Sequence, residues 1–444
     1  MKIKILFAGL LTLALFTAGY AQTPDKAKLE QFFDQLAEKN KAMGSLTVAR
    51  DGKVLYTRAI GYSHINGTEK KPLTAATRYR VGSITKMFTA AMILQLVEER
   101  KLKLTDTLDK FFPQIPNAKK ITIAHILAHR SGIHDVFEDP NLRPSKTAPK
   151  TPSELLAIIA KGTPDFEPDA KYSYSNSGYV LLGIIVEKVG GKPYQEALKK
   201  RITSKIGLKD TYVGTGNVDV NKNESFSYRY VRDWEQQTEV HSSLLFGSGA
   251  IVSTPTDLIS FIQALFDGKI VSKESLASMK TIRDGYGLGM DTFSFAGKTL
   301  YGHTGGIDNF GSWLAYLPEE KLVVAYTSNA KVYPVAKIMD GILDIYYNKP
   351  FTIPAFDTID VSPEVLDKYV GVYSIPGVPV KFTVTRDDAT LFIQMTGQSA
   401  IPLEAMAQDK FGIESAEIVF EFDAAKNQMI QKRSGRERVF TKEN

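Results

Sequence analysis

Cysteine is absent from this sequence, and a strong charge imbalance and a second long apolar run are absent as well. Zero cysteines among 444 residues exclude disulfides, thiol catalysis and cysteine-ligated metal sites. The 55 lysines and arginines only slightly exceed the 49 aspartates and glutamates, and a formal charge of +6 gives no reason to expect a nucleic-acid partner. After the N-terminal region no segment approaches about 18 consecutive apolar residues, so we expect no stable membrane span in the mature protein.

The N-terminal region has the three parts of a secretory signal peptide. Two lysines precede an apolar run over residues 5–18, and the small-residue pattern Gly19-Tyr20-Ala21 leads into a polar segment. We predict a signal peptide over residues 1–21, cleaved after Ala21. The alternative is an uncleaved membrane anchor, because the run is nearly long enough to span a thinned bilayer. No cysteine follows the run, which excludes a lipoprotein, so the predicted location is the periplasm or the medium.

Composition and proline placement divide the chain into a long and a short part. With 43% hydrophobic and 23% charged residues, the chain is typical of a globular protein with a large core. Prolines cluster around residues 351–362, which we take as a linker between a domain over 22–350 and a domain over 363–444. The short part contains brief alternating apolar runs, such as 418–422, so we predict a small antiparallel β domain.

Turn and periodicity signals in the long part favour an α+β fold. Asp51-Gly52 is a two-residue hairpin signal between two apolar runs, and a second pair of apolar runs flanks residues 318–321. Between these hairpins, residues 87–98 are apolar almost all round, which predicts a helix buried in the centre of the domain. Strands at both ends with helices between them predict one antiparallel sheet that is built from the terminal strands and flanked by helices.

The segment Ser83-Ile84-Thr85-Lys86 stands directly before the apolar helix. Serine alone is a poor nucleophile and needs a base within hydrogen-bond reach. If a helix begins here, Ser83 and Lys86 lie one turn apart on one face, and the positive end of the helix dipole faces the charge that develops on Ser83. The spacing alone is a weak signal, because it recurs at Ser328 and Lys331 with no apolar helix behind it.

Two companion motifs follow in a fixed order. Tyr174-Ser175-Asn176 comes next, and His303-Thr304-Gly305-Gly306 stands at the start of the late strand region. The ordered triplet resembles the SxxK, YxN and K/H-T-G motifs of the serine β-lactamase and penicillin-binding protein superfamily. Within it, the similarity is to the branch of class C β-lactamases, DD-peptidases, D-aminopeptidases and related esterases. The resemblance covers about residues 25–345.

Three further stretches add to this resemblance, over residues 126–132, 247–255 and 286–289. The resemblance implies the β-lactamase/transpeptidase-like fold, in which an antiparallel sheet is flanked by helices and accompanied by an all-helical region. The short C-terminal part looks like the lipocalin-like or β-barrel extension that some members carry.

The resemblance also implies a role for each motif residue. Ser83 would attack a carbonyl and form an acyl-enzyme, while Lys86 and Tyr174 would share proton transfer, the lysine charge favouring a tyrosinate. Asn176 would hold the substrate amide and orient Lys86. The backbone N–H groups of Ser83 and Gly306 would form the oxyanion hole, which needs an edge strand at this segment. Nothing matches the acidic deacylation residue of class A enzymes, so Tyr174 would serve both half-reactions.

The third motif would contribute substrate contacts through Thr304 and Gly305, and His303 stands where many relatives have lysine. No Lys-Thr-Gly occurs in the sequence, and that lysine would supply a permanent positive charge for a substrate carboxylate. If the site leaves the pKa of His303 near its unperturbed value of about 6.5, His303 titrates close to neutrality. We therefore expect carboxylate-bearing substrates to bind less well as the pH rises through that titration.

Other candidate residues have plainer explanations. His125 and His129 have the spacing of a metal pair, but Ile126 stands where a metalloprotease has glutamate, so we predict structural roles and no metal site. Tyr346-Tyr347-Asn348 repeats the YxN pattern after the third motif and is expected to be a helix end. The isolated histidines are assigned to the surface or core: His64, His134 and His241.

These motifs predict a serine hydrolase that needs no cofactor and whose partner is a small molecule or a peptide, including peptides derived from peptidoglycan. D-amino-acid peptides, small amides or esters are the first prediction, and a class C-like β-lactamase is the alternative. An alternative of another class is a catalytically silent protein that binds cell-wall ligands. The sequence makes no prediction of the oligomeric state.

Overall fold

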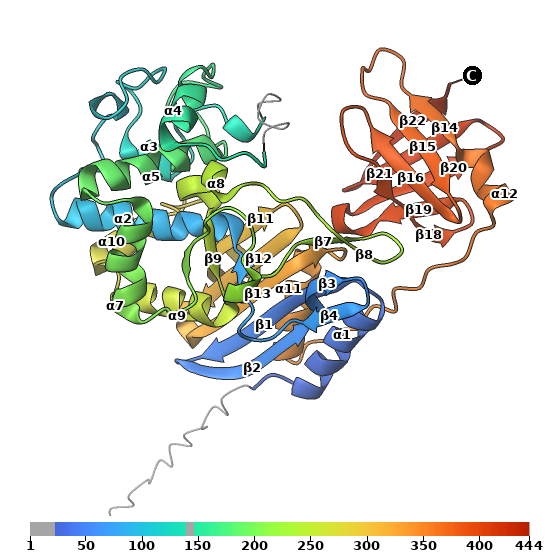
Figure 1. Cartoon of the computed structure of the whole chain (residues 1–444), viewed down its shortest axis with the longest axis horizontal. Helices are drawn as coiled ribbons and strands as arrows, with labels where there is room; N and C mark the ends of the chain where they lie inside the picture. The colour runs from blue at the N-terminus through green and yellow to red at the C-terminus, as the bar shows by residue number, and fades with distance from the viewer. Residues whose placement is uncertain (1–22, 139–145, 444) are drawn as a thin grey trace, which may run out of the picture.

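A computed structural model describes residues 23–138 and 146–443, so the predicted signal peptide lies outside the described residues. Within this part of the chain, no helix is both long and apolar enough to cross a membrane. The described residues form a large α+β body and, on its C-terminal side, a smaller body of strands (Figure 1). The predicted fold class is confirmed.

A six-stranded antiparallel sheet forms the centre of the large body, with its strands in the order β10-β11-β12-β13-β1-β2. The last strands of this body therefore pair with its first strands, as predicted. The strands are β1 (Ala42–Arg50), β2 (Lys53–Ile60), β10 (Asp291–Phe295), β11 (Lys298–Ile307), β12 (Phe310–Leu317) and β13 (Leu322–Lys331).

The two predicted hairpins are the β1–β2 and β12–β13 pairs. Asp51 and Gly52 have φ values of 48° and 76°, the left-handed conformation for which an Asp-Gly turn is suited. The second connection is a short 3-10 turn over Pro318–Glu320. The residues of these two turns therefore help to set the register of the strands that they connect.

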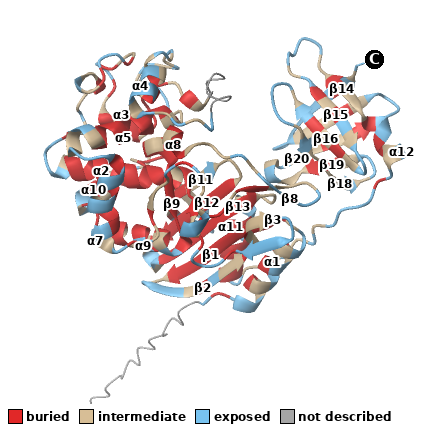
Figure 2. Cartoon of the chain, in the orientation of Figure 1, coloured by how far each residue is buried: buried red, intermediate tan, exposed pale blue. Residues whose placement is uncertain are grey.

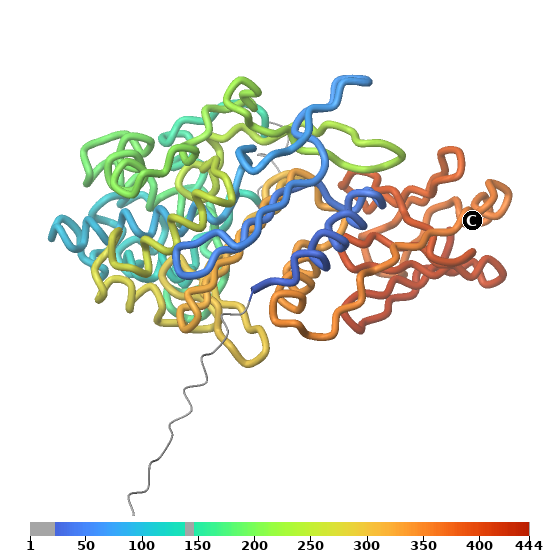
Figure 3. Tube along the Cα trace, turned by 90° about the horizontal axis from the view of Figure 1, so that it is seen from below, coloured from blue at the N-terminus to red at the C-terminus, as the bar shows by residue number. Residues whose placement is uncertain are grey.

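Helices cover both faces of the sheet (Figure 1). On one face, α1 (Lys26–Glu38) and α11 (Val335–Tyr346) pack side by side, and Figure 3 shows the dark blue α1 beside the orange segment that follows the sheet. On the other face, α9 (Pro255–Phe266) contacts β1, β12 and β13. The predicted helix end at Tyr346 is confirmed, since α11 ends there.

The central helix of the other face is α2 (Thr85–Glu98), and every one of its residues from Thr85 to Leu96 is buried (Figure 2). A helix that is apolar all round has no solvent face, because other helices enclose it. The other helices of this region are α3 (Ile123–Leu127), α4 (Pro152–Ala160), α5 (Asn176–Gly190), α6 (Tyr194–Leu198), α7 (Ser204–Ile206), α8 (Ser242–Gly249) and α10 (Lys273–Met279). Of these, α5, α6 and α8 contact α2.

Short strand pairs join the sheet to the helical region. β5 lies against β9, which also pairs with β6, while β3 pairs with β4 and β7 with β8. Their bounds are β3 (Tyr62–Asn66), β4 (Glu69–Pro72), β5 (Tyr79–Arg80), β6 (Tyr212–Val213), β7 (Tyr228–Tyr230), β8 (Trp234–Gln236) and β9 (Ile251–Ser253).

The C-terminal body is an antiparallel meander whose first strand, β14, pairs with its last, β22. Its helix is α12 (Pro363–Leu366), and its strands are β14 (Gly371–Ser374), β15 (Phe382–Asp387), β16 (Thr390–Met395), β17 (Ile401–Pro402), β18 (Glu404–Ala407), β19 (Lys410–Ile413), β20 (Ile418–Asp423), β21 (Gln428–Arg433) and β22 (Arg436–Lys442). The strands enclose an apolar core of their own that includes Phe411, Phe420 and Phe440.

The two bodies meet at the N-terminal end of β1. Lys41 is only 4% exposed, and its Nζ lies 2.5 Å from Glu404 and 2.7 Å from Glu414 of the C-terminal body. The connection between the bodies also packs on the first one, because Phe351 meets Phe32 of α1 edge to face at 5.0 Å. The first residues of the linker that we predicted over 351–362 thus pack against the core between the sheet and α1.

Candidate active site

Ser83 lies in a 3-10 turn, η1 (Gly82–Ile84), that runs directly into α2. Gly82 has a φ of +51°, a conformation that glycine adopts without strain. The turn leaves Ser83 partly exposed while the rest of the helix start is buried. The expected placement of Ser83 at the N-terminal end of a buried helix is therefore what the structure has.

Lys86 is fully buried and directed at Ser83. Its Nζ donates to Ser83 Oγ at 3.0 Å, to Asn176 Oδ1 at 2.7 Å and to the backbone oxygen of Ser248 at 2.9 Å. Burial lowers the pKa of Lys86 to about 7, and the charge of Asp135 only partly offsets this effect. The neutral amine that a general base requires is thus well populated near neutral pH.

Tyr174 and Asn176 of the second motif both lie next to the Lys86 ammonium group. The ring centre of Tyr174 lies 4.8 Å from Lys86 Nζ. Burial raises the pKa of Tyr174, and its hydrogen bond with Ser83 offsets this only in part. The expectation that Lys86 favours a tyrosinate is not met here, because burial opposes charge on both groups and brings the pKa of Lys86, not that of Tyr174, close to neutrality.

Asp135 holds Asn176 in place, and sequence reasoning missed it. Its Oδ2 accepts from the Asn176 side-chain amide at 2.8 Å and from the Asn176 backbone N–H at 3.2 Å. This fixes which end of the amide faces Lys86, since Asn176 Oδ1 must then accept from the lysine. No motif pointed to Asp135, which follows the stretch over residues 126–132 that carried part of the family resemblance.

The edge of β11 lies against the η1 turn. In the described part of the chain, β10 pairs with β11 only up to Gly302, so His303 and the residues after it have an unpaired edge. A Cβ on Gly305 would lie 2.0 Å from the Val81 oxygen, and one on Gly82 would lie 2.9 Å from the Gly306 nitrogen. Glycines thus allow the backbone of Gly306 to approach Ser83, as an oxyanion hole built from their two amides requires.

The His303 side chain is buried, and each of its ring nitrogens has a hydrogen-bond partner. Its Nδ1 faces the Thr304 backbone oxygen at 2.5 Å and its Nε2 faces the Tyr286 hydroxyl at 2.9 Å. Because a carbonyl oxygen can only accept, Nδ1 carries the proton and Nε2 accepts from Tyr286. Burial, reinforced by the charge of Lys86, lowers the pKa of His303 to about 3. The expectation that His303 titrates near neutrality is therefore wrong, since a desolvated ring beside a lysine stays neutral.

His125 and His129 each accept a hydrogen bond from a backbone N–H group. His129 is buried, accepts from the Ser175 N–H through Nδ1 at 3.1 Å and stacks on Tyr174 with ring centres 4.1 Å apart. His125 instead caps the start of α3 with Thr122. Among the described residues, no group of three metal-ligating side chains comes together. His129 thus supports the Tyr174 ring and is a positioning residue.

An antiparallel sheet flanked by helices, with a buried Ser–Lys pair beside a Tyr-x-Asn segment, defines a protein of the serine β-lactamase and transpeptidase fold. The sequence model of the β-lactamase family matches residues 29–346, and the chain belongs to this family.

Individual relatives agree with this assignment. The chain is 27% identical over 439 residues to a penicillin-binding protein of Bacillus subtilis strain 168, covering 90% of this chain and 95% of that one. It is 23% identical to the D-alanyl-D-alanine-carboxypeptidase/endopeptidase AmpH of Escherichia coli strain K12, over 80% of this chain and all of that one. The crystal structure of the D-amino acid amidase of Ochrobactrum anthropi SV3 with D-phenylalanine superposes with a TM-score of 0.62 at 26% identity, covering 72% of this chain and 99% of that one.

Proposed function

We propose that this protein is an exported serine hydrolase that acts through an acyl-enzyme on D-amino-acid peptides or amides, or on small esters. The observation that carries the proposal is the distance of 3.0 Å between Lys86 Nζ and Ser83 Oγ in surroundings that lower the pKa of Lys86 to about 7. Fully buried lysines are rarely found without a carboxylate partner, whereas this one is surrounded by neutral oxygen acceptors and directed at a serine hydroxyl.

In the acylation step, the neutral Lys86 amine takes the Ser83 hydroxyl proton while Ser83 Oγ forms a bond to the substrate carbonyl carbon. The carbonyl oxygen becomes an oxyanion between the backbone N–H groups of Ser83 and Gly306. When the bond to the leaving amine or alkoxide breaks, the leaving group receives the proton through Lys86 and the Tyr174 hydroxyl. Water then attacks the carbonyl carbon of the acyl-enzyme ester and gives up one proton to the same pair. The bond from that carbon to Ser83 Oγ breaks, and the pair returns the proton to Ser83 Oγ.

The substrate class is supported by the family and by the relatives' names. The names of a D-alanyl-D-alanine-carboxypeptidase, which is a sequence relative, and of a D-amino acid amidase, which shares this fold, both point to D-amino-acid substrates. β-Lactamase activity stays the competing candidate within the family, because the family as a whole carries that name. Export is supported by the signal-peptide pattern of residues 1–21, and a secreted protein that starts at Gln22 would bear it out.

The proposal is tested by measuring turnover of four substrates: a D-Ala-D-Ala peptide, a D-amino-acid anilide, a short-chain ester and a chromogenic cephalosporin. We expect the first three to be hydrolysed and Ser83→Ala to abolish the turnover of each. Exclusive turnover of the cephalosporin would make the protein a β-lactamase instead. Loss of all four activities in a folded protein that still binds the peptide would indicate a silent binding protein.

A further inference from the structure

Lys331, the last residue of β13, extends its side chain toward the active-site strand. Its Cδ lies 3.0 Å from where a Cβ on Gly311 would stand, and its Nζ lies 3.8 Å from where a Cβ on Gly306 would stand. Gly306 is the residue whose amide would form the oxyanion hole. Two glycines on neighbouring strands therefore leave room for an ammonium group beside the strand edge at which a substrate carbonyl would bind.

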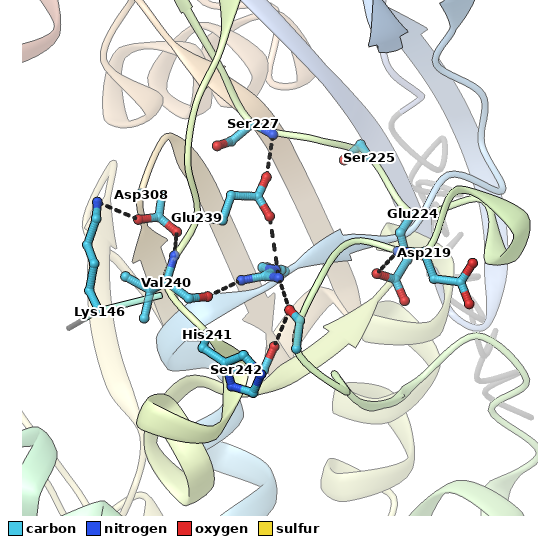
Figure 4. A network of polar contacts seen from close by, with 12 residues as sticks. Lys146, Asp219, Glu224, Ser225, Ser227, Glu239, Val240, His241, Ser242 and Asp308 are labelled. Atoms are coloured by element: carbon cyan, nitrogen blue, oxygen red, sulfur yellow. Dashed lines mark hydrogen bonds and ion pairs between the residues drawn. The ribbon is translucent and has the colours of Figure 1, made fainter. Parts of the chain in front are cut away.

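The charge of Lys331 is not balanced locally. Within residues 23–138 and 146–443, no carboxylate forms an ion pair with Lys331, although Asp308 acts on it electrostatically. Asp308 is already engaged, since its Oδ2 accepts from the Val240 N–H at 2.9 Å and its Oδ1 faces Lys146 Nζ at 3.9 Å (Figure 4). One carboxylate thus faces two ammonium groups, which leaves an excess positive charge at this end of β11.

The nearby charges of Arg80 and Glu239 are paired with each other. Glu239 lies 3.4 Å from Arg80 and accepts from the Ser227 N–H at 2.7 Å (Figure 4). His303, at the position where relatives carry a lysine, is neutral, as shown above. Burial lowers the pKa of Lys331, and an anion bound beside it would restore the solvation of the ammonium that burial removes.

We propose that Lys331 binds an anionic group of the substrate, a carboxylate close to the scissile bond, and thereby selects substrates with a free carboxylate over their neutral amides. This inference rests on the proposed function, and within it favours carboxypeptidase-type substrates over amino-acid amides. Lys331 takes no part in bond making. It is a specificity-determining residue that supplies, from β13, the charge that His303 does not supply from β11.

The test uses two ligands that differ only in charge, an acyl-D-Ala-D-Ala peptide with a free C-terminal carboxylate and the same peptide as its C-terminal amide. We expect the wild-type protein to favour the carboxylate, and Lys331→Met to lower its kcat/KM roughly 10- to 100-fold, mainly through KM. The amide should change by less than about twofold, because a methionine of similar length keeps the packing. Lys331→Arg should retain most of the preference.

The matched control is Lys337→Met, on the exposed side of α11 near the C-terminal body, where Lys337 Nζ lies 3.6 Å from Glu417. It should leave both substrates unchanged. Lys331→Gln replaces the methionine variant if that variant does not fold. Equal loss for both ligands in Lys331→Met and Lys331→Gln, or no loss for either, would overturn the inference and leave Lys331 a packing role.

Binding separates this inference from the proposed function. The two peptides are also titrated calorimetrically into Ser83→Ala protein with and without Lys331→Met. A carboxylate preference that disappears with Lys331 supports the inference even if the wild-type protein turns over neither peptide, in which case the proposed function fails alone. Hydrolysis of esters together with equal binding of the two peptides would contradict the inference while leaving the hydrolase proposal intact.

Discussion

At the scale of single residues, Lys86 is solvated by three neutral oxygen atoms and has no carboxylate in direct contact. Neutral acceptors stabilise an ammonium less than an anion does, so burial dominates and its pKa drops from 10.5 to about 7. In the folded protein the proton is therefore held less tightly than in the unfolded chain. Burial of Lys86 therefore lowers the stability of the folded protein at neutral pH, and the same burial makes the neutral amine available to accept a proton.

The first prediction concerns the pH dependence of ester hydrolysis. Below pH 7 most Lys86 side chains are protonated and cannot accept the Ser83 proton. We expect kcat/KM for a neutral ester to rise about tenfold per pH unit up to roughly pH 7 and to level off above it. His303, with a pKa of about 3, should contribute no inflection between pH 5.5 and 8. A profile that is flat across this range would contradict the assignment of Lys86 as the base.

The second prediction tests the influence of Asp135 on Lys86. The charge of Asp135 raises the pKa of Lys86, so Asp135→Asn should move the inflection of the profile to lower pH. The plateau should also fall, because Asp135 accepts from Phe137 and Asn176 through its two oxygens and an asparagine has only one oxygen to replace them. As a control, Asp165→Asn removes a more exposed carboxylate next to His134 and should leave the inflection in place. An inflection that moves to higher pH in Asp135→Asn would contradict the prediction that the charge of Asp135 raises the pKa of Lys86.

At the scale of elements, the contact between the η1 turn and β11 depends on glycines. Gly305→Ala would place a methyl group 2.0 Å from a backbone oxygen, so η1 and β11 would have to separate. We expect Gly305→Ala to lose at least about 100-fold in activity, the scale seen when an oxyanion-hole donor is lost. Gly306→Ala, whose methyl group would meet nothing closer than Lys331 Nζ at 3.8 Å, should fold normally and keep most of its ester hydrolysis. Equal effects of the two substitutions on activity would contradict this picture.

The sequence predicted elements whose signals are local and missed those that depend on long-range pairing. The buried helix α2 could be predicted because residues 87–98 have no polar face, and the β1–β2 turn because Asp51-Gly52 suits positive φ. The point at which β10 leaves β11 could not, since that register is set by contacts far apart in the chain. The same holds for Asp135 and for the neutral state of His303, which arises from burial that a sequence motif does not show.

At the scale of the whole molecule, we propose that the large body folds and acts without the C-terminal strands, since Ser83, Lys86, Tyr174 and Gly306 all lie within it. The segment that connects the two bodies also contributes to the large body, because Phe351, Ile353 and Phe356 pack on its core. A protein of residues 22–357 should therefore melt several degrees above one of residues 22–350, and both should hydrolyse a neutral ester. Truncation also removes the two carboxylates that face Lys41, which lowers the stability of both proteins.

Differential scanning calorimetry of the two truncated proteins checks this prediction, with the full chain as the reference. Equal melting temperatures of the two truncated proteins would show that residues 351–357 are a linker, as the sequence alone suggested. Insolubility or inactivity of both would mean that the C-terminal body completes the core or the substrate site.

The central claim, that Ser83 is the nucleophile activated by Lys86, is tested most directly by mass spectrometry of the covalently labelled protein. The protein is treated with a fluorophosphonate or a penicillin and then digested with trypsin, which cuts after Arg80 and after Lys86. We predict a single adduct on the peptide Val81–Lys86, in which Ser83 is the one serine, and no adduct in Ser83→Ala. An adduct on any other peptide, or labelling that persists in Ser83→Ala, would contradict the account.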